Sequence, residues 1–389
     1  MSKLHKVCTE GDGVLADVQL DNQVKQRRKR LSISQQQLAD RTGVSRQAII
    51  AIEAGRQVPS TSLSLLLARV LECSVEHLFQ LSLPQGLQVR MPQEAFHHQT
   101  QQEPNGRALL GYVSGDWVGH PLRSNTRVAA DGIIQGYGPN DTFLVEPFFD
   151  AEVLKKNVLV AGCAPLLGAL TQRVGSQFRD AQATWLATNS LRSLQWLANG
   201  LVHIAGLHLF EPELEEANLA AVRKAFPHTK MLMVNLTRWQ QGLIVPPGNP
   251  LGLSSIEDVL RPGLRFVQRE EGAGATKLVR QLLSERGATD ATPSGPYASG
   301  HQEVAQFIQY GAGDVGVAIE SVAIAAGLDF LPLAEERFDL VLPYDLANTP
   351  PVSRFLEALD NTTFQTEMSY LPGYNNAISG HVTTIERPQ

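Results

Sequence analysis

The sequence predicts an α-helical N-terminal domain, a small β-element and a two-lobed α/β domain, over residues 20–82, 83–152 and 153–389. Short amphipathic helices with tight turns fill the first part, and apolar strands alternate with amphipathic helices in the last. The charge divides in the same way. Residues 20–80 hold nine Lys/Arg against five Asp/Glu, a net charge of +4, whereas the whole chain has a net charge of −6. A basic module joined to an acidic body indicates that only the N-terminal part binds nucleic acid.

The composition is that of a soluble globular protein, with 43% hydrophobic and 19% charged residues over 389 positions. No stretch approaches the roughly 18 consecutive apolar residues of a membrane span, and the polar start has no signal-peptide core. We therefore expect a cytoplasmic protein with no membrane partner. The three cysteines, Cys8, Cys73 and Cys163, are far apart, which favours neither a disulfide framework nor a C-x-x-C metal site. We expect no metal and no cofactor.

The N-terminal domain has the start and stop signals of a helix-turn-helix. Ser34 can cap a first helix, Gly43 can take the positive φ that ends it, and Ser45 can cap the next helix. Ile49 and Ile52, three positions apart, would face the core from this second helix. The second helix then packs its apolar side on the first and projects its polar side outward.

The exposed start of the second helix carries Arg46 and Gln47, which suit the edges of guanine and adenine. The stretch SQQQLADRTGVSRQAIIAIEAGRQVPS resembles the xenobiotic-response-element (XRE) family of helix-turn-helix domains, to which small phage repressors belong. The resemblance implies double-stranded operator DNA as a partner. It places seven residues at the DNA: Arg46, Gln47 and Ile50 or Ala51 near base edges, and Gln35, Arg56 and Ser60 near phosphates. The alternative is a helical bundle that makes only protein contacts, which the basic run from Lys25 to Arg30 disfavours.

The segment from 83 to 152 predicts a Gln- and Pro-rich linker followed by short strands and turns. His97 and His98 have no third ligand at metal spacing, so we interpret them as a solvent-facing pair. No function follows from this segment.

The α/β domain should bind a ligand beyond the carboxyl ends of its strands, often at helix N-termini. These ends carry small and neutral polar residues: Gly162, Cys163, Ala164, Asn189, Ser190, His208, Gly272, Ala273, Gly274, Ala275 and Thr276. Such a cleft suits a compact oxyanion or a zwitterion held by neutral hydrogen bonds. His208 is either a ligand-binding residue or a satisfied core histidine. No G-x-S-x-G elbow or metal triad is present, so we expect no enzyme and no catalytic residue.

Two long stretches, QGLIVPPGNPLGLSSIEDVLRPGLRFVQREEGAGATKLVRQLL and HQEVAQFIQYGAGDVGVAIESVAIAAGLDFLPLAEERFDLVLP, resemble a periplasmic-binding-protein-like (type II) domain. That family is linked to molybdate and molybdenum-cofactor metabolism. The resemblance implies a first lobe of about 153–235 and 341–389, a second lobe of about 236–340, and crossings near 233–237 and 340–343. His301 aligns with a family histidine, although a locally bonded helix-start residue is an equal alternative. The family's loop reads G-S-G-T-R, so the sequence here lacks two hydroxyls and an arginine, and the loop's charge selectivity is reduced.

Together these features predict a one-component transcription regulator that binds operator DNA as a homodimer or higher homo-oligomer. Its sensor domain would bind a small molecule, with molybdate, tungstate or a molybdenum-cofactor precursor as the implied ligand. An enzyme or carrier of cofactor metabolism, with the helix-turn-helix as a protein-docking module, is the alternative. A redox regulator that uses Cys163 is a third hypothesis.

Overall fold

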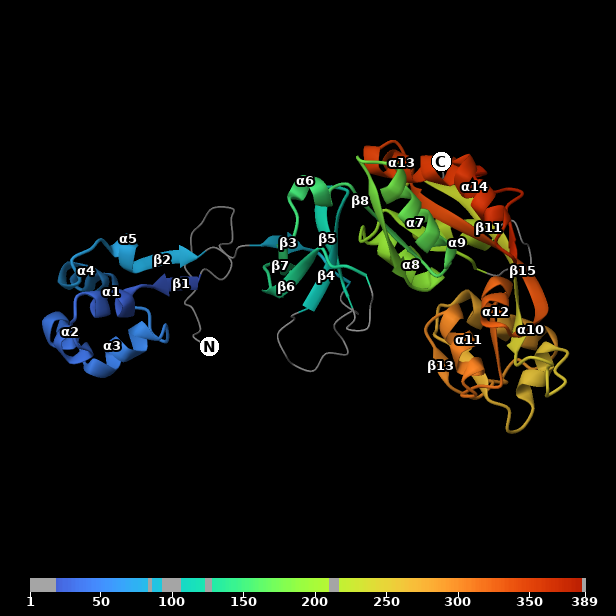
Figure 1. Cartoon of the computed structure of the whole chain (residues 1–389), viewed down its shortest axis with the longest axis horizontal. Helices are drawn as coiled ribbons and strands as arrows, with labels where there is room; N and C mark the ends of the chain where they lie inside the picture. The colour runs from blue at the N-terminus through green and yellow to red at the C-terminus, as the bar shows by residue number, and fades with distance from the viewer. Residues whose placement is uncertain (1–18, 83–85, 93–105, 123–127, 210–216, 387–389) are drawn as a thin grey trace. The chain divides into compact units, whose positions relative to one another are not determined.

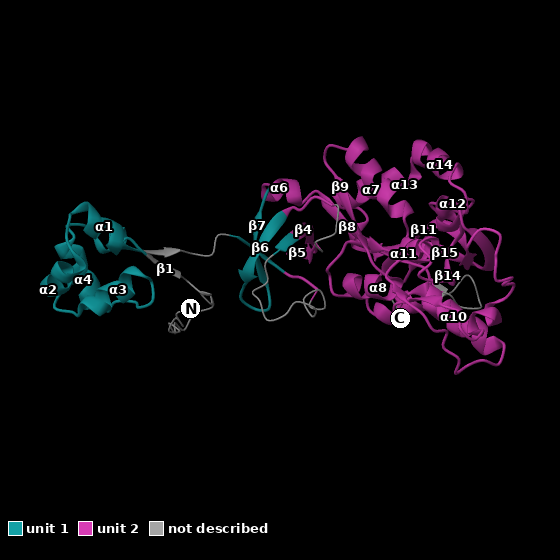
Figure 2. Ribbon diagram, turned by 60° about the horizontal axis from the view of Figure 1, so that its bottom comes forward, with its two compact units in different colours: residues 1–89, 100–107, 132–148 teal, residues 90–99, 108–131, 149–389 magenta. Residues whose placement is uncertain are grey.

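The computed structural model describes residues 19–82, 86–92, 106–122, 128–209 and 217–386 of the chain (Figure 1). The predicted His97–His98 pair and Cys8 lie outside these residues. Contacts divide the chain into two compact units, one of residues 1–89, 100–107 and 132–148 and one of the remainder (Figure 2).

Five short helices form the N-terminal domain. They are α1 (Val24–Arg30), α2 (Gln35–Thr42), α3 (Arg46–Glu53), α4 (Thr61–Val70) and α5 (Val75–Leu78). Strands β1 (Gln19–Asn22) and β2 (Phe79–Ser82) pair antiparallel at its two ends. Nine buried apolar side chains make the core, among them Leu38, Ile49 and Ile52.

The local signals of the helix-turn-helix are confirmed. The Ser34 hydroxyl accepts from the backbone N–H of Gln37 in a capping box, and Gly43 ends α2 with φ of 72°. The Ser45 hydroxyl caps α3 by accepting from the N–H of Ala48. The turn therefore sets the direction of α3 through backbone geometry and side-chain caps.

The middle segment supplies short antiparallel strands to both units. Strand β7 (Phe143–Pro147) pairs with β3 (Leu87–Val89) and β6 (Gly132–Tyr137). Strands β4 (Gly106–Val113) and β5 (Asp116–Pro121) form a hairpin whose residues from Ala108 onward belong to the second unit. Helix α6 (Ala151–Leu154) leads into the α/β domain. Leu109, Val113 and Val118 of the hairpin are buried in the same hydrophobic cluster as the first lobe's strands.

A ten-stranded mixed sheet runs through the two-lobed α/β domain, as the sequence predicts for the fold class. Its main path has the order β13-β12-β14-β11-β15-β10-β8-β9, and β16 and β17 pair with β11. The strands are β8 (Asn157–Gly162), β9 (Gln182–Ala187), β10 (Ile204–Leu207), β11 (Met231–Val245), β12 (Phe266–Arg269), β13 (Tyr297–Ala298), β14 (Val315–Ile319), β15 (Asp329–Pro343), β16 (Tyr374–Asn375) and β17 (Val382–Ile385).

Helices cover both faces of the sheet in each lobe (Figures 1 and 2). Lobe 1 has α7 (Leu166–Gln177), α13 (Pro350–Asp360) and α14 (Thr362–Ser369) on one face, with α8 (Ser190–Ala198) and α9 (Ala217–Ala225) on the other. Lobe 2 has α11 (His301–Gln309) and α12 (Glu320–Ala326) opposite α10 (Gly274–Glu285) and the short 3-10 helix η2 (Ile256–Leu260). A second 3-10 turn, η3 (Tyr344–Leu346), follows β15.

The two long strands β11 and β15 join the lobes, and here the structure corrects the sequence prediction. The pattern of apolar stretches in the sequence predicts separate strands in KMLMVNLT and QGLIVP, and again in DFLPL and FDLVLP. Each pair instead forms one strand of 15 residues. The antiparallel pairing of β11 with β15 provides hydrogen-bond partners for the backbone N–H and C=O groups through the polar stretch. The register shifts after Asn235 and after Gln241. The implied crossings at 233–237 and 340–343 lie inside these strands.

The stretch VSRFLEALDNTTFQTEMSYL, residues 352–371, reads in sequence as one C-terminal helix, but the structure has two helices there. Asn361 ends α13 with extended backbone and caps α14 by accepting from the N–H of Thr363. Within the described residues, no helix combines the length and apolarity needed to cross a membrane.

Candidate functional site

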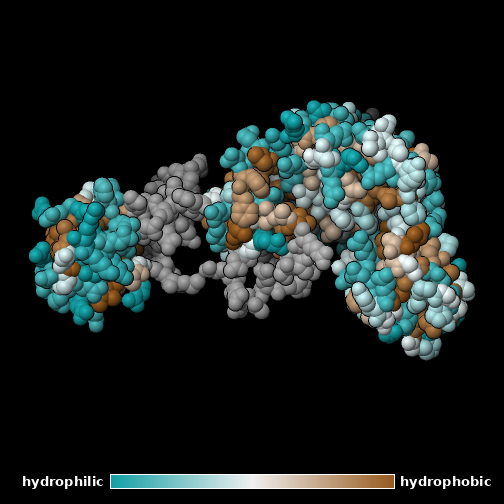
Figure 3. Space-filling model, in the orientation of Figure 1, coloured by the Kyte–Doolittle hydropathy of each residue, from teal (hydrophilic) through white to brown (hydrophobic). Residues whose placement is uncertain are grey.

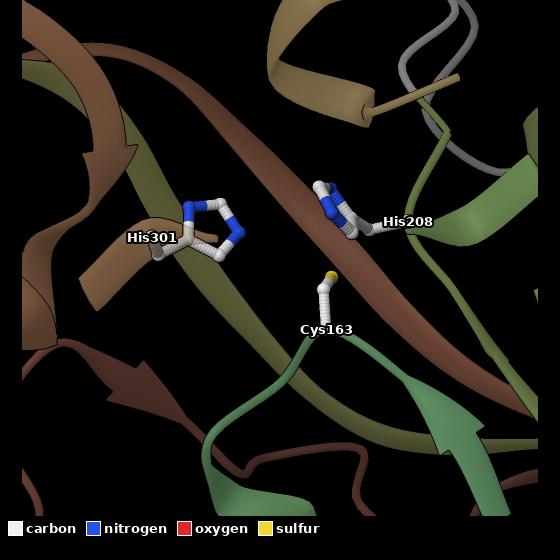
Figure 4. A group of neighbouring side chains, drawn as sticks. All are labelled: Cys163, His208 and His301. Carbon is white, nitrogen blue, oxygen red and sulfur yellow. The ribbon is translucent and has the colours of Figure 1, made fainter. Parts of the chain in front are cut away.

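The candidate ligand site lies where the two lobes meet. Cys163 follows β8 and His208 follows β10 in lobe 1, whereas His301 is the first residue of α11 in lobe 2. Their side chains point toward one another in Figure 4, and one ligand atom from each lies within 4.8 Å of the other two. His208 and His301 are both buried, and Cys163 is half-buried. The structure therefore gathers three sequence-predicted residues into one cluster.

His208 is held between a carboxylate and a thiol. Its Nδ1 lies 2.8 Å from Oε2 of Glu336 on β15, and Gln241 of β11 donates to the same carboxylate oxygen at 2.7 Å. Burial by itself would lower the pKa of His208, but Cys163 and Glu336 outweigh it and raise the pKa above its ordinary value. Trp239 packs edge-on against the ring, with centroids 5.2 Å apart. His208 is thus a fixed, polar member of the cluster.

His301 has a different environment. Its Nδ1 lies 3.5 Å from a guanidinium nitrogen of Arg269, and Arg269 is itself paired with Glu270 at 3.0 Å. Burial, with the charges of Arg269 and His208, lowers the pKa of His301 well below its usual value, so the ring is neutral. Its Nε2 is buried with no hydrogen-bond partner.

The glycine-rich loop over 272–276 packs against lobe 1. Gly272 has φ of 86°, which favours glycine, and a Cβ added at Gly274 would lie 2.4 Å from the carbonyl oxygen of His208. The Thr276 hydroxyl donates back to the carbonyls of Arg269 and Glu270 at 3.1 Å, so it closes its own turn.

Asn189 and Ser190 at the start of α8 complete the contact between the lobes. Asn189 caps the helix, and its amide nitrogen lies 3.4 Å from Oε1 of Glu270 and from the carbonyl oxygen of Glu271. The Ser190 hydroxyl bonds to the backbone of His208, accepting at 3.1 Å. Hydrogen bonds thus hold lobe 1 against the loop of lobe 2.

The remaining predicted cleft residues belong to the packing around the site. Gly162 is fully buried, and a Cβ there would lie 3.2 Å from the Cα of Gly206. Ala164 lies in the lobe-1 core and Ala275 in the lobe-2 core. Ala273 is buried at the N-cap of α10. These residues allow the strands and helices around the cleft to approach closely.

Sequence reasoning missed four residues of the site: Trp239, Gln241, Arg269 and Glu336. Three of them lie on β11 and β15, in the polar stretches that interrupt the apolar strand patterns. Buried polar residues inside a strand need hydrogen-bond partners and can therefore mark a binding site, but the apolar pattern alone predicts a break between two strands there.

A separate pocket of about 190 Å³ lies inside lobe 2, lined by residues of β12 and α10. Arg269 and Thr276 line it from the loop side, whereas Cys163, His208 and His301 do not. The chemistry-bearing cluster and this pocket are therefore different places, and we assign the candidate site to the cluster.

In the N-terminal domain, the predicted DNA-contacting residues differ in exposure. Arg46 and Gln47 at the start of α3 are exposed, as are Arg56 and Ser60. Ile50 and Ala51 are half-buried. The Ser60 hydroxyl caps α4 by accepting from the N–H of Leu63.

Two arginines of the predicted basic run make hydrogen bonds within the domain and so stabilise the fold. Arg28 is buried and donates two hydrogen bonds to Glu53, and Gln35 donates to the same carboxylate at 2.8 Å. Burial by itself would raise the pKa of Glu53, but the bonds from Arg28 and Gln35 hold the pKa below its ordinary value. Arg27 donates to the carbonyls of Leu71 and Glu72. Lys25, Lys29 and Arg30 remain exposed.

Comparison with known proteins agrees with this architecture. Residues 24–78 match the helix-turn-helix family. An uncharacterised HTH-type transcriptional regulator of Methanothermobacter thermautotrophicus is 48% identical over 48 residues, which are 12% of this chain and 70% of that protein. The regulator YgzD of Bacillus subtilis is 39% identical over 62 residues, 16% of this chain and 94% of its own length. The chain belongs to the helix-turn-helix family.

The two-lobed part of this helix-turn-helix protein matches the PBP superfamily domain over residues 172–360. The protein YvgK of Bacillus subtilis is 25% identical over 230 residues, 59% of this chain and 74% of that protein. Among solved structures, the sulfate-binding protein SubI of Mycobacterium tuberculosis is 15% identical, with a TM-score of 0.44 over 56% of this chain and 85% of that chain. An ABC-type phosphate transport receptor of Vibrio cholerae is 14% identical, with a TM-score of 0.40 over 56% and 99%.

Proposed function

We propose that the protein is a cytoplasmic one-component transcription regulator. The N-terminal domain binds operator DNA, and a small molecule bound between the two lobes changes that binding. Two observations support the DNA role: Ser45 caps α3 and two of its apolar residues are buried, while Arg46 and Gln47 at its start are exposed. The ligand acts only through a difference in its affinity for two arrangements of the protein.

The observation that carries the ligand role is the set of buried polar atoms without partners in the cleft. Among the described residues these include His301 Nε2, Gln241 Oε1 and Glu336 Oε1. Each unsatisfied buried group costs about 1–3 kcal/mol, and buried polar atoms in folded proteins are nearly always paired. A polar ligand between the lobes would satisfy them and favour closure.

Within this function we propose an oxyanion as the ligand, with molybdate or tungstate first. The starts of α8, α10 and α11 all contribute residues to the cleft, and a helix N-terminus favours negative charge. The buried guanidinium of Arg269 adds a positive charge beside His301. The negative charges of Glu336 and Glu270 limit how much anionic charge the cleft tolerates, which favours a compact, hydrogen-bonded species.

Thermal unfolding with molybdate, tungstate, sulfate, phosphate and a metabolite panel tests the ligand class. A ligand at 100 times its Kd adds about 2.7 kcal/mol to the stability. If molybdate or tungstate alone raises the melting temperature, the proposal for the ligand stands. If only an organic compound does, the oxyanion proposal is wrong and the regulator proposal continues with that compound.

Selection of binding sites from random duplex DNA tests the regulator role directly. We expect an enriched palindrome and an affinity that falls steeply with salt, because phosphate contacts release counterions. A protein that enriches no sequence, or that turns over a cofactor precursor, would instead support the enzyme or carrier.

The N-terminal domain also offers a surface for the proposed homodimer. Val58, Leu65 and Leu66 are 52%, 59% and 43% exposed, and Figure 3 shows apolar surface on this domain among hydrophilic residues. A dimer would place two α3 helices about 34 Å apart, the spacing of successive major grooves.

A further inference from the structure

We propose that Cys163, His208 and His301 form a binding site for a borderline divalent metal ion, with zinc as the first candidate. The site lies in the same cleft as the proposed ligand, but the inference goes beyond the proposed function and requires neither DNA nor an oxyanion. No short-range ligand motif predicts it, because the three residues are 45 and 93 positions apart in sequence. Only the fold brings them together.

The donor set is the first argument. A cysteine sulfur and two histidine nitrogens are ligands that zinc prefers, and three protein ligands with a fourth open position are common in zinc sites. Their ligand atoms lie within 4.8 Å of one another. Zn–S and Zn–N bonds of about 2.3 and 2.0–2.1 Å place tetrahedral ligand atoms roughly 3.5 Å apart. Side-chain movements of roughly 1 Å therefore close the site.

The second argument is the orientation of the two rings. Nδ1 of His208 is bonded to Glu336 at 2.8 Å, so its other nitrogen is the one available to a metal. Metal-binding histidines almost always donate their other ring N–H to a carboxylate, a backbone carbonyl or a water, which fixes the ring. His301 is 2% exposed, and its Nε2 points toward Cys163 and His208 without any protein partner (Figure 4). A buried nitrogen of this kind needs a partner, and a metal would take that place with release of the proton from Nε2.

The third argument is charge. Metal binding requires the thiolate form of Cys163, and with the Glu336 carboxylate this places two negative charges at the centre. Arg269 lies 3.5 Å from the far nitrogen of His301 and brings one positive charge, which its contacts to Glu270, at 3.0 and 3.3 Å, offset in part. A divalent cation would neutralise the thiolate and the Glu336 carboxylate, which lie on the other side of the cluster.

The position of the ligands implies a role in closure. Cys163 and His208 belong to lobe 1, and His301 belongs to lobe 2. A metal bound to all three ties the lobes together. Zinc binding would therefore stabilise the closed arrangement that the contacts between Asn189 and the loop already favour.

The test is a titration of the metal-stripped full-length protein with Co²⁺ and then Zn²⁺. We expect one Co²⁺ per chain, with the sulfur-to-cobalt charge-transfer band and the intense visible bands of tetrahedral coordination, and displacement by Zn²⁺. Cys163→Ser should abolish the charge-transfer band, and His301→Gln should abolish high-affinity binding. Glu336→Gln should weaken binding by about 10- to 100-fold while the charge-transfer band remains.

Two matched variants control for a thiol outside the cluster and for an exposed imidazole. Cys73→Ser and His228→Gln lie outside the cluster and should bind Co²⁺ as the wild type does. Circular dichroism and urea unfolding without metal check that each variant is folded. The proposal is overturned if the folded wild type shows no sulfur-to-cobalt band, or if folded Cys163→Ser retains it. Operator binding by the metal-stripped protein is measured separately, so failure of the metal site and failure of the regulator proposal are distinguishable.

Discussion

Gly274 lies where the two lobes touch, and replacing it with alanine tests whether this contact controls closure. A Cβ at this position would lie 2.4 Å from the carbonyl oxygen of His208 and 2.6 Å from its Nδ1. Non-bonded heavy atoms pack best at about 3.5 Å or more. The loop of lobe 2 must therefore withdraw from lobe 1 by roughly 1 Å in Gly274→Ala.

The size of the effect follows from the cost of overpacking, about 1–3 kcal/mol. This corresponds to a factor of roughly 5 to 150 in the equilibrium between closed and open lobes. Helix propensity acts in the opposite direction, because alanine is favoured over glycine within a helix by about 0.5–1 kcal/mol. Gly274 is the first residue of α10, so any loss of stability in Gly274→Ala must come from the contact with His208.

The assay measures the rate at which Cys163 reacts with a maleimide, followed by peptide mass analysis, together with urea unfolding. We expect Gly274→Ala to increase the labelling rate and to lower the free energy of unfolding. Gly175→Ala in α7 is the control, because no atom lies within 4 Å of a Cβ there. Equal labelling and equal stability in the two variants would refute the reasoning.

Three further predictions concern the N-terminal domain. Arg46→Ala should lose about 1–3 kcal/mol of discrimination at one base pair, and an unchanged preference in site selection would contradict its assigned role. Glu53→Gln should destabilise the domain by about 1.5–3 kcal/mol in urea unfolding near pH 7, because it weakens the hydrogen-bonded pair with the buried Arg28. Since the folded pKa of Glu53 is below its ordinary value of 4.5, this stabilisation is present above pH 4.5 and is lost as the pH falls through the folded pKa. The free energy of unfolding of Glu53→Gln should not show this loss at acid pH. If the wild type and the variant lose stability equally as the pH falls, the pair of Arg28 and Glu53 is not the cause. Replacing Leu65 and Leu66 with glutamine should convert the proposed dimer to a monomer in light scattering, and a wild type that is already monomeric would exclude this interface.

The helix-turn-helix was predictable because its signals are local. Ser34 and Ser45 each cap a helix through a backbone N–H three positions away, and Gly43 takes the positive φ that ends α2. Interactions over a few residues are visible in a one-dimensional pattern. The exposed location of Arg46 and Gln47 followed from the same local geometry.

The basic run from Lys25 to Arg30 shows where prediction from local sequence patterns fails. Its charges predict a solvated or DNA-facing surface, yet Arg28 is buried against Glu53, 25 residues away. A buried arginine needs a partner of opposite charge, and no local pattern reveals which acid supplies it.

For the two-lobed domain, the sequence by itself predicted the alternation of strands and helices, the glycine loop, and Cys163, His208 and His301 as candidate ligand-binding residues. These lie at strand ends and helix starts, where ligand sites of α/β folds occur. Tertiary structure alone decided that the three meet within 4.8 Å and that Glu336 reaches His208 across 128 positions. The reason is that β11 and β15 pair along their full length, so polar residues that interrupt each apolar pattern, such as Gln241 and Glu336, become buried beside this cluster.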